Sequence, residues 1–243
     1  MRQLPLAIGP EPQPSFDSFI VGRNAAAAAH LLALKPPAAP VYLWGPAGSG
    51  KTHLLRAVAR RFLAAGQGVG WFGHARAAPH VLDPGWALVA FDRCEALGEA
   101  AQQSLYALFE AAAAEGVAFV AAGRLPPVDL PLREDLRTRL AWGHVFALEP
   151  LAEAETRAAL RREADRRGIF LSDEVMSHLM TRFARDLAHL MPLLDRLDEF
   201  ALARSRPVTV PLLRQMLAEE GGAGAGEGEG APPGDDAEMD RPA

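Results

Sequence analysis

Short apolar runs alternate with helix-period segments over residues 15–149 of the chain. The runs PVYLWG, GVGWFGH, WALVAFD and VAFVAAG, then a shorter HVFAL, have the length and apolarity of parallel strands that helices cover on both faces. Between the third and fourth runs, EAAQQSLYALFEAAAAEG predicts a long helix that ends at Gly116. The pattern therefore predicts an α/β domain with a parallel sheet.

Residues 150–218 change to a purely helical pattern, which predicts a small helical lid. Four amphipathic segments follow one another, and each carries start or stop signals. These signals are Gly168 as a stop, Ser172 as an N-cap, Pro192 as a kink or a start, Thr209 as an N-cap and Pro211 in a first turn.

The two ends of the chain have the composition of segments without a core. Residues 1–14 form a Pro-rich leader, and residues 219–243 form a Gly-rich acidic tail that we expect to be disordered. The tail holds eight of the 30 acidic residues and one of the 25 basic ones, so the rest of the chain is slightly basic despite a net charge of −5.

Composition excludes several classes of protein. No apolar run is long enough to span a membrane, and no secretory signal pattern precedes the first domain, so we expect a cytoplasmic protein. No basic cluster is dense enough to indicate nucleic-acid binding. The single cysteine, Cys94, follows an apolar run and is expected to be a small core residue.

The stretch GPAGSGKT, residues 45–52, is a complete phosphate-binding loop between an expected strand and an expected helix. Such a loop turns backbone N–H groups toward phosphates, and the helix N-terminus adds its positive dipole end. We expect Lys51 to reach the β- and γ-phosphates and Thr52 to bind Mg²⁺. A chance Gly-rich turn is the alternative, and the strand–helix context disfavours it. The nucleotide-binding candidates here are Gly45, Pro46, Gly48, Ser49, Gly50, Lys51, Thr52 and His53.

Asp92 ends the third apolar run and is the candidate carboxylate for supporting Mg²⁺, with an N-cap role as the alternative. ATPases with this arrangement usually carry a second carboxylate next, and this chain has Arg93, which cannot act as a general base. Glu95 is a candidate substitute that we expect to point elsewhere. Intrinsic hydrolysis of ATP should therefore be slow.

Three further stretches resemble the DnaA-related AAA+ family. FDSFIVGRNAAAAAH resembles the segment that opens the ATPase domain of the bacterial replication initiator DnaA, LRTRLAWGH resembles its arginine-finger motif, and ARDL resembles the sensor II start of its lid helix. The resemblance implies an αβα P-loop sheet with a C-terminal helical lid, bound ADP or ATP with Mg²⁺, and further nucleotide contacts from Val21, Gly22 and Arg185. It also implies that Arg139 is an arginine finger acting in trans. The alternative is a structural role, in which Arg139 forms an ion pair with Glu134 or Asp135 on the same helix.

No DNA-binding domain follows the expected lid, which makes the chain similar to the shortened Hda branch of this family, the regulatory inactivators of DnaA. In that branch the leader binds the β sliding clamp of DNA polymerase III. QLPLAI resembles this clamp-binding peptide through Gln3, Leu4, Leu6 and Ile8, and an ordinary frayed terminus is the alternative.

The resemblance implies two partners, the DNA-loaded clamp and DnaA, with no membrane and no sequence-specific DNA contact, and it leaves a homo-oligomer open. A self-sufficient AAA+ motor or helicase loader is the rival function, and turnover of ATP by the chain alone would distinguish it. A P-loop kinase would need an acceptor site and an acidic base, for which no candidate exists. The chain departs from the family at Gly123 and Arg124, where a polar sensor residue is expected, and this departure favours ADP.

Overall fold

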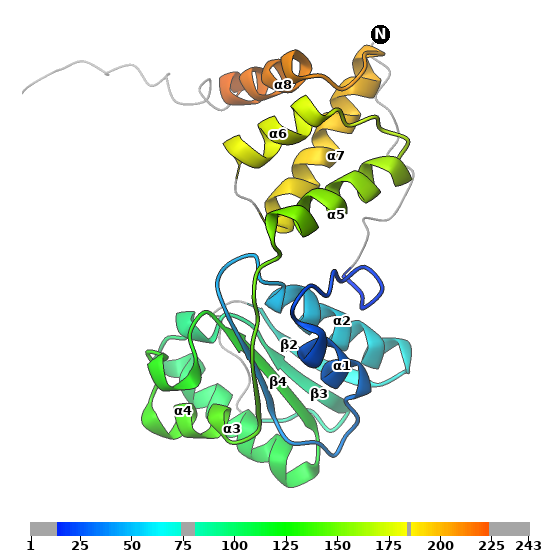
Figure 1. Cartoon of the computed structure of the whole chain (residues 1–243). Helices are drawn as coiled ribbons and strands as arrows, with labels where there is room; N and C mark the ends of the chain where they lie inside the picture. Colours follow the sequence, from blue (N-terminus) through cyan, green and yellow to red (C-terminus); the bar gives the residue numbers. More distant parts are fainter. Residues whose placement is uncertain (1–13, 74–80, 184–185, 224–243) are drawn as a thin grey trace, which may run out of the picture.

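The computed structural model describes residues 14–73, 81–183 and 186–223, which form an α/β domain and a smaller helical domain (Figure 1). The expected α/β class with a helical lid is confirmed. No helix in these three ranges is both long and apolar enough to cross a membrane.

Within the described ranges, five parallel strands form one sheet in the order β2-β3-β4-β1-β5. Trp44, at the end of β1, pairs with the last residues of both neighbouring strands, Gly123 and Ala147. The carboxyl ends of these strands therefore meet at one edge, where sites form in open α/β sheets. The strands are β1 (Val41–Trp44), β2 (Gly68–Phe72), β3 (Trp86–Phe91), β4 (Ala118–Gly123) and β5 (His144–Ala147).

Alternate residues of the central strands face opposite layers of helices. Val41 and Leu43 are buried in a cluster with α1 and α2, whereas Tyr42, between them, is buried in a second cluster with α3 and α4. Both faces of the sheet are thus covered, which explains the nearly continuous apolar runs. These helices are α1 (Ala25–Ala33), α2 (Lys51–Ala64), α3 (Glu99–Glu115) and α4 (Glu134–Ala141).

The helical domain has its own apolar core, in which Leu160, Met176, Leu194 and Leu213 are fully or almost fully buried. Its helices, at the top of Figure 1, are α5 (Glu153–Arg166), α6 (Asp173–Arg182), α7 (Leu187–Arg204) and α8 (Val210–Ala223).

The helix signals in the sequence act largely as expected. Gly116 ends α3 in the left-handed conformation, and Ser172 caps α6 by accepting a hydrogen bond from the Val175 N–H at 3.3 Å. Thr209 accepts one from Leu212 N–H at 3.4 Å ahead of α8. Pro192 lies inside α7 and does not begin it, because Asp186 provides the N-cap.

Four features of the described chain were not expected from the sequence. Helix α1 forms in the alanine run of residues 25–33, and α2 begins at Lys51, inside the phosphate-binding loop motif. Two short 3₁₀ helices, η1 (Cys94–Ala96) and η2 (Pro127–Asp129), follow β3 and β4. Helix α8 continues to Ala223, past residue 218, where we placed the end of the lid.

Candidate nucleotide site and arginine-finger surface

The loop between β1 and α2 is held in a glycine-dependent conformation. Gly48 and Gly50 have φ of +76° and +94°, values that side-chain-bearing residues rarely adopt. A Cβ on Gly48 would lie 2.3 Å from Asp186 Cβ, and one on Gly50 would lie 2.7 Å from the Phe19 ring. The loop is therefore packed between the lid and the segment that precedes α1, and neither glycine has room for a side chain.

Lys51 begins α2 with its ammonium turned back onto the loop. Its Nζ donates to the carbonyls of Gly45 and Pro46 at 2.7 Å each, and to Ser49 Oγ at 3.3 Å. Burial lowers the pKa of Lys51, and the negative charges of Glu95 and Asp92 oppose this shift. A cation enclosed by a loop at a helix N-terminus fits a phosphate group.

Thr52 and Asp92 bring two oxygen ligands together beside the loop. Thr52 Oγ1 donates to Asp92 Oδ2 at 2.6 Å, and Asp92 is 5% exposed. This pair of oxygens suits Mg²⁺, which prefers carboxylate and hydroxyl ligands together with water and phosphate. The described residues contain no group of three or more His, Cys, Asp or Glu side chains that could hold a metal by themselves. The site therefore fits a cation that a nucleotide helps to bind.

The position after Asp92 cannot supply a base. Arg93 is exposed and adopts the left-handed conformation, with φ of 59°, while its N–H donates to Asp92 Oδ1 at 3.0 Å. Glu95 faces the end of β4, where its Oε2 accepts the N–H of Arg124 at 3.0 Å. The Arg124 guanidinium lies 3.6 Å from the other carboxylate oxygen.

Tertiary packing explains why the residue at the end of β4 is a glycine. A Cβ on Gly123 would lie 2.2 Å from the Tyr42 hydroxyl, which donates to the Leu125 carbonyl at 2.9 Å. Burial raises the pKa of Tyr42, so this hydroxyl stays protonated. The space that a polar sensor side chain would occupy is therefore filled by Tyr42.

The segment before α1 lies against the start of α2. His53 Nε2 donates to the Ser15 carbonyl at 2.8 Å, and its ring lies 5.4 Å from that of Phe19. Burial lowers the pKa of His53, and the hydrogen bond to Ser15 opposes the shift. Val21 is 40% exposed, and Gly22 lies where a Cβ would meet Leu151 at 2.9 Å.

Sequence reasoning missed a residue that connects this segment to the start of the lid. Asn24 is 4% exposed, and its amide exchanges two hydrogen bonds of 2.9 Å with the backbone N–H and carbonyl of Glu149. Arg23 adds an exposed ion pair to the Glu149 side chain at 3.0 Å. The sequence signal was a single Asn before an alanine run, which has no spacing to indicate a partner 125 residues away.

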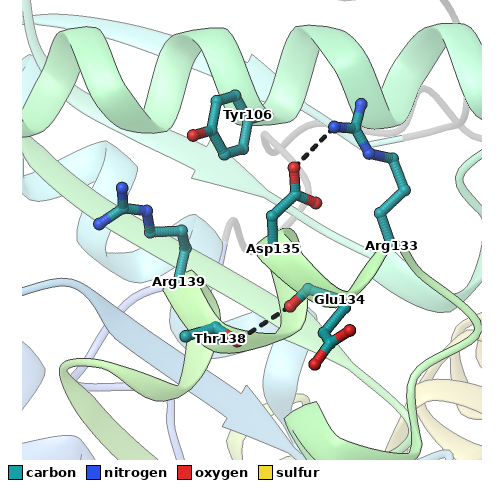
Figure 2. Close-up of a pocket in the computed structure, with 6 residues that line it drawn as sticks. All are labelled: Tyr106, Arg133, Glu134, Asp135, Thr138 and Arg139. Carbon is teal, nitrogen blue, oxygen red and sulfur yellow. Dashed lines mark hydrogen bonds and ion pairs between the residues drawn. The ribbon is translucent and has the colours of Figure 1, made fainter.

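Arg139 lies on α4, at an open surface pocket of about 610 Å³ (Figure 2). Its Nε is 2.9 Å from Glu110 Oε1 on α3, and the Arg139 side chain is 38% exposed. The ion-pair partner of Arg139 is therefore Glu110, and the alternative of a pair with Glu134 or Asp135 is wrong. Asp135 pairs with Arg133 at 2.6 Å. The pocket is lined by Tyr106, Arg133, Glu134, Asp135, Thr138 and Arg139.

Five of the candidate residues, Gln3, Leu4, Leu6, Ile8 and Arg185, lie outside the described residues. The neighbour of Arg185, Asp186, does touch the phosphate-binding loop through its packing against Gly48. This contact places the start of α7 beside the loop.

Two family descriptions match separate parts of the chain. "Bacterial DnaA ATPAse domain" matches residues 11–69, and "Hda, lid domain" matches residues 153–217. The first match covers the beginning of the α/β domain, through α2, and the second covers the helical domain.

The chain is a DnaA-related AAA+ protein of the Hda type.

Solved structures have the same fold. Domain III of the Thermotoga maritima replication initiation protein DnaA is 19% identical, with a TM-score of 0.71 over 87% of this chain and 98% of that domain. AMPPCP-bound DnaA from Aquifex aeolicus is 18% identical, with a TM-score of 0.63 over 77% of this chain and 66% of that one. The Thermotoga maritima RuvB Holliday junction branch migration motor is 18% identical, with a TM-score of 0.61 over 85% of this chain and 72% of that one.

In this Hda-type chain the structure brings together the loop residues, Asp92 and the segment that carries Val21 and Gly22. Arg139 lies apart from them, on α4, and makes its own ion pair with α3. The chain thus has two candidate sites, the phosphate-binding loop with Asp92 and the surface residue Arg139.

Proposed function

We propose that this chain is an ADP-bound negative regulator of replication initiation. In this proposal it docks on the DNA-loaded sliding clamp and stimulates hydrolysis of the ATP that DnaA holds. The observation that carries the proposal is Arg139, a partly exposed guanidinium beside an open pocket. In the chain's own nucleotide site, Arg93 follows Asp92 and Glu95 is paired with Arg124.

The nucleotide itself has a structural role in this proposal. The loop from Gly45 to Thr52 holds the phosphates through backbone N–H groups and Lys51, and Thr52 and Asp92 hold Mg²⁺ through their oxygens. A bound nucleotide supplies negative charge between the loop and the start of α7. Because Asp186, at the start of α7, lies beside Gly48, a nucleotide bound in the loop would lie between the sheet and the lid.

The chain's own residues are poorly suited to turnover. Arg93 keeps its proton, and both carboxylate oxygens of Glu95 are engaged by Arg124. Neither of these two side chains therefore offers a free acceptor for the proton of a water molecule. ADP serves the structural role as well as ATP does.

Arg139 supplies the chemistry that the partner lacks. Its planar guanidinium can meet two phosphate oxygens at once and stabilise charge that develops on a transferred phosphoryl group. An arginine finger supplied in trans accelerates hydrolysis by about 10³ to 10⁵ in the GTPase case. Release of Arg139 from Glu110 costs little, because both side chains are near 40% exposed.

The leader attaches the chain to the clamp in this proposal. Gln3, Leu4, Leu6 and Ile8 form a short extended peptide with alternating apolar anchors, and Pro5 lowers the entropic cost of ordering it. Attachment to a clamp on DNA would concentrate Arg139 near DnaA only after a clamp has been loaded.

The test is hydrolysis of DnaA-bound ATP in the presence of this chain, with the clamp either loaded on DNA or omitted. The proposal expects strong acceleration only with loaded clamp. Acceleration that does not depend on the clamp would contradict the docking step, and no acceleration at all would contradict the function.

A self-sufficient motor is the second candidate, because the fold also matches RuvB with a TM-score of 0.61. The motor requires steady-state ATP turnover by the purified chain without partners. The inactivator requires almost none, so a single phosphate-release assay separates them.

A further inference from the structure

Trp142 is a large apolar side chain that the chain's own fold leaves mostly uncovered. It is 67% exposed, whereas tryptophan side chains are on average highly buried in folded proteins. Trp142 follows the last residue of α4 and keeps a right-handed helical backbone, with φ of −71° and ψ of −29°. Its N–H donates to the Arg139 carbonyl at 3.2 Å. The backbone of Trp142 therefore continues α4 by one residue.

Helical spacing puts Trp142 beside Arg139. Trp142 lies three residues after Arg139 and four after Thr138, and both of these residues line the pocket in Figure 2. Residues at these two spacings share one face of a helix, with about 5–6 Å between their Cβ atoms. Trp142 thus extends the pocket-lining face of α4 by one turn.

Val145 adds a second exposed apolar side chain on the same side of the sheet. It lies in the edge strand β5 and is 39% exposed. Its register partner on β1 is Tyr42, which packs into the cluster with α3 and α4, so Val145 also faces the layer that contains α4. Two residues separate Trp142 from Val145 in the chain, so their Cα atoms lie within about 11 Å of each other. We call Trp142 and Val145 the apolar ledge.

We infer that the apolar ledge is the surface on which the nucleotide-bearing face of DnaA docks when Arg139 reaches its ATP. The inference rests on the proposed function, and its physical reason is distance. A guanidinium that binds phosphate oxygens comes within about 2.7–2.9 Å of them, so the partner's surface then lies against the adjoining face of α4. Trp142, one turn away on that face, is covered by the same partner.

The ledge and Arg139 have different roles in this arrangement. A tryptophan that becomes buried at the centre of an interface is among the residues that contribute most to affinity. The ledge therefore determines how tightly DnaA binds, whereas Arg139 determines how fast the bound ATP is hydrolysed.

The test is a titration of ATP-bound DnaA against a fixed amount of this chain, with the clamp loaded on DNA. The titration yields a maximal rate of hydrolysis and a half-saturating DnaA concentration. Trp142→Ala should raise the half-saturating concentration by about tenfold and leave the maximal rate nearly unchanged, because Arg139 is still present. Arg139→Ala should instead lower the maximal rate.

Three further variants make the test specific. Trp142→Phe keeps an aromatic ring and should retain most of the wild-type affinity. Val145→Ala should raise the half-saturating concentration by about threefold, and it tests the ledge even if Trp142→Ala fails to fold. Leu63→Ala is the matched control and should titrate as wild type does, because Leu63 is 60% exposed on α2, which covers the other face of the sheet.

The outcomes separate this inference from the proposed function. If wild type stimulates hydrolysis and both ledge variants have an unchanged half-saturating concentration, the inference is wrong and the proposed function stands. A lower maximal rate at an unchanged half-saturating concentration would also overturn it, because the ledge would then act through Arg139. Self-association of wild type that Trp142→Ala abolishes, measured by sedimentation without DnaA, would assign the ledge to a second copy of this chain. Absence of any stimulation by wild type would overturn the proposed function, and this inference with it.

Discussion

Arg139 on α4 and Glu110 on α3 form an ion pair, with 2.9 Å between Nε and Oε1. The pair crosses between two helices that cover the same face of the sheet, and Arg139 lines the pocket in Figure 2. Both partners are near 40% exposed, so solvent screens the attraction and the pair contributes about 0–1 kcal/mol to stability. The arginine is therefore held in place only weakly, which suits a group that must move to a partner.

The first prediction separates a finger from a structural ion pair. Arg139→Ala should remove most of the stimulation of DnaA-bound ATP hydrolysis, and Arg139→Lys should restore little of it, because an ammonium cannot make the bidentate contact. Glu110→Gln is the matched control, since it breaks the same ion pair but keeps the guanidinium. Equal loss of stimulation in Arg139→Ala and Glu110→Gln would assign Arg139 a structural role.

The second prediction concerns the leader. Gln3→Ala, or Leu6→Ala together with Ile8→Ala, should abolish capture of the chain by immobilised clamp. Nucleotide affinity and the thermal unfolding midpoint should stay the same, because the Pro-rich composition of residues 1–14 predicts no part in the core. Gln13→Ala removes the same side chain outside the peptide and should bind clamp normally. If the double substitution binds clamp with wild-type affinity, the peptide assignment is wrong.

The third prediction concerns the loop lysine. Lys51→Ala should weaken binding of ADP and ATP by tenfold or more (on the order of 1.4 kcal/mol), because it removes a charge-assisted contact with phosphate. Arg56→Ala, one turn further along α2 on the exposed side, removes an equal charge and should change affinity little. Calorimetry with both nucleotides measures the effect, and similar losses in the two variants would show that only general charge matters.

The fourth prediction concerns the contact between loop and lid. Gly48 and Gly66 have nearly the same φ, +76° and +73°, but a Cβ meets Asp186 at 2.3 Å in the first case and nothing within 4 Å in the second. Gly66→Ala should therefore cost about 1–2 kcal/mol from backbone strain alone. Gly48→Ala should cost more in urea unfolding and should also weaken ADP binding. Identical effects of the two substitutions would mean that the lid contact contributes nothing.

The fifth prediction concerns the connection between the segment before α1 and the start of the lid. Asn24→Ala leaves two backbone groups of Glu149 without their partners and should lower the free energy of unfolding by about 2 kcal/mol. Arg23→Ala removes only an exposed ion pair to the same residue and should cost less than about 1 kcal/mol. Urea denaturation of both variants measures the difference. A smaller loss for Asn24→Ala than for Arg23→Ala would contradict the assignment.

The sequence by itself determined the parts of this protein that depend on neighbours along the chain. A helix cap such as Ser172, a helix stop such as Gly116 and the phosphate-binding loop at residues 45–52 are local patterns with local causes. The alternation of short apolar runs with helical segments also predicted the α/β class, because a strand that is buried on both faces is a continuous apolar run.

Only the tertiary structure decided which side chains meet across the fold. Arg139 pairs with Glu110 and not with a neighbour on its own helix, and Glu95 turns toward Arg124 although it follows a different strand. Sequence spacing carries no information about such pairs, because their separation depends on how helices and strands pack.

The glycine at position 123 shows the physical reason most directly. The sequence shows only that Gly123 stands where the family has a polar sensor residue. In the fold, the hydroxyl of Tyr42, 81 positions earlier on the adjacent strand, occupies the place of a Cβ at this position. Strand register brought the two together, and close packing then excluded any side chain there.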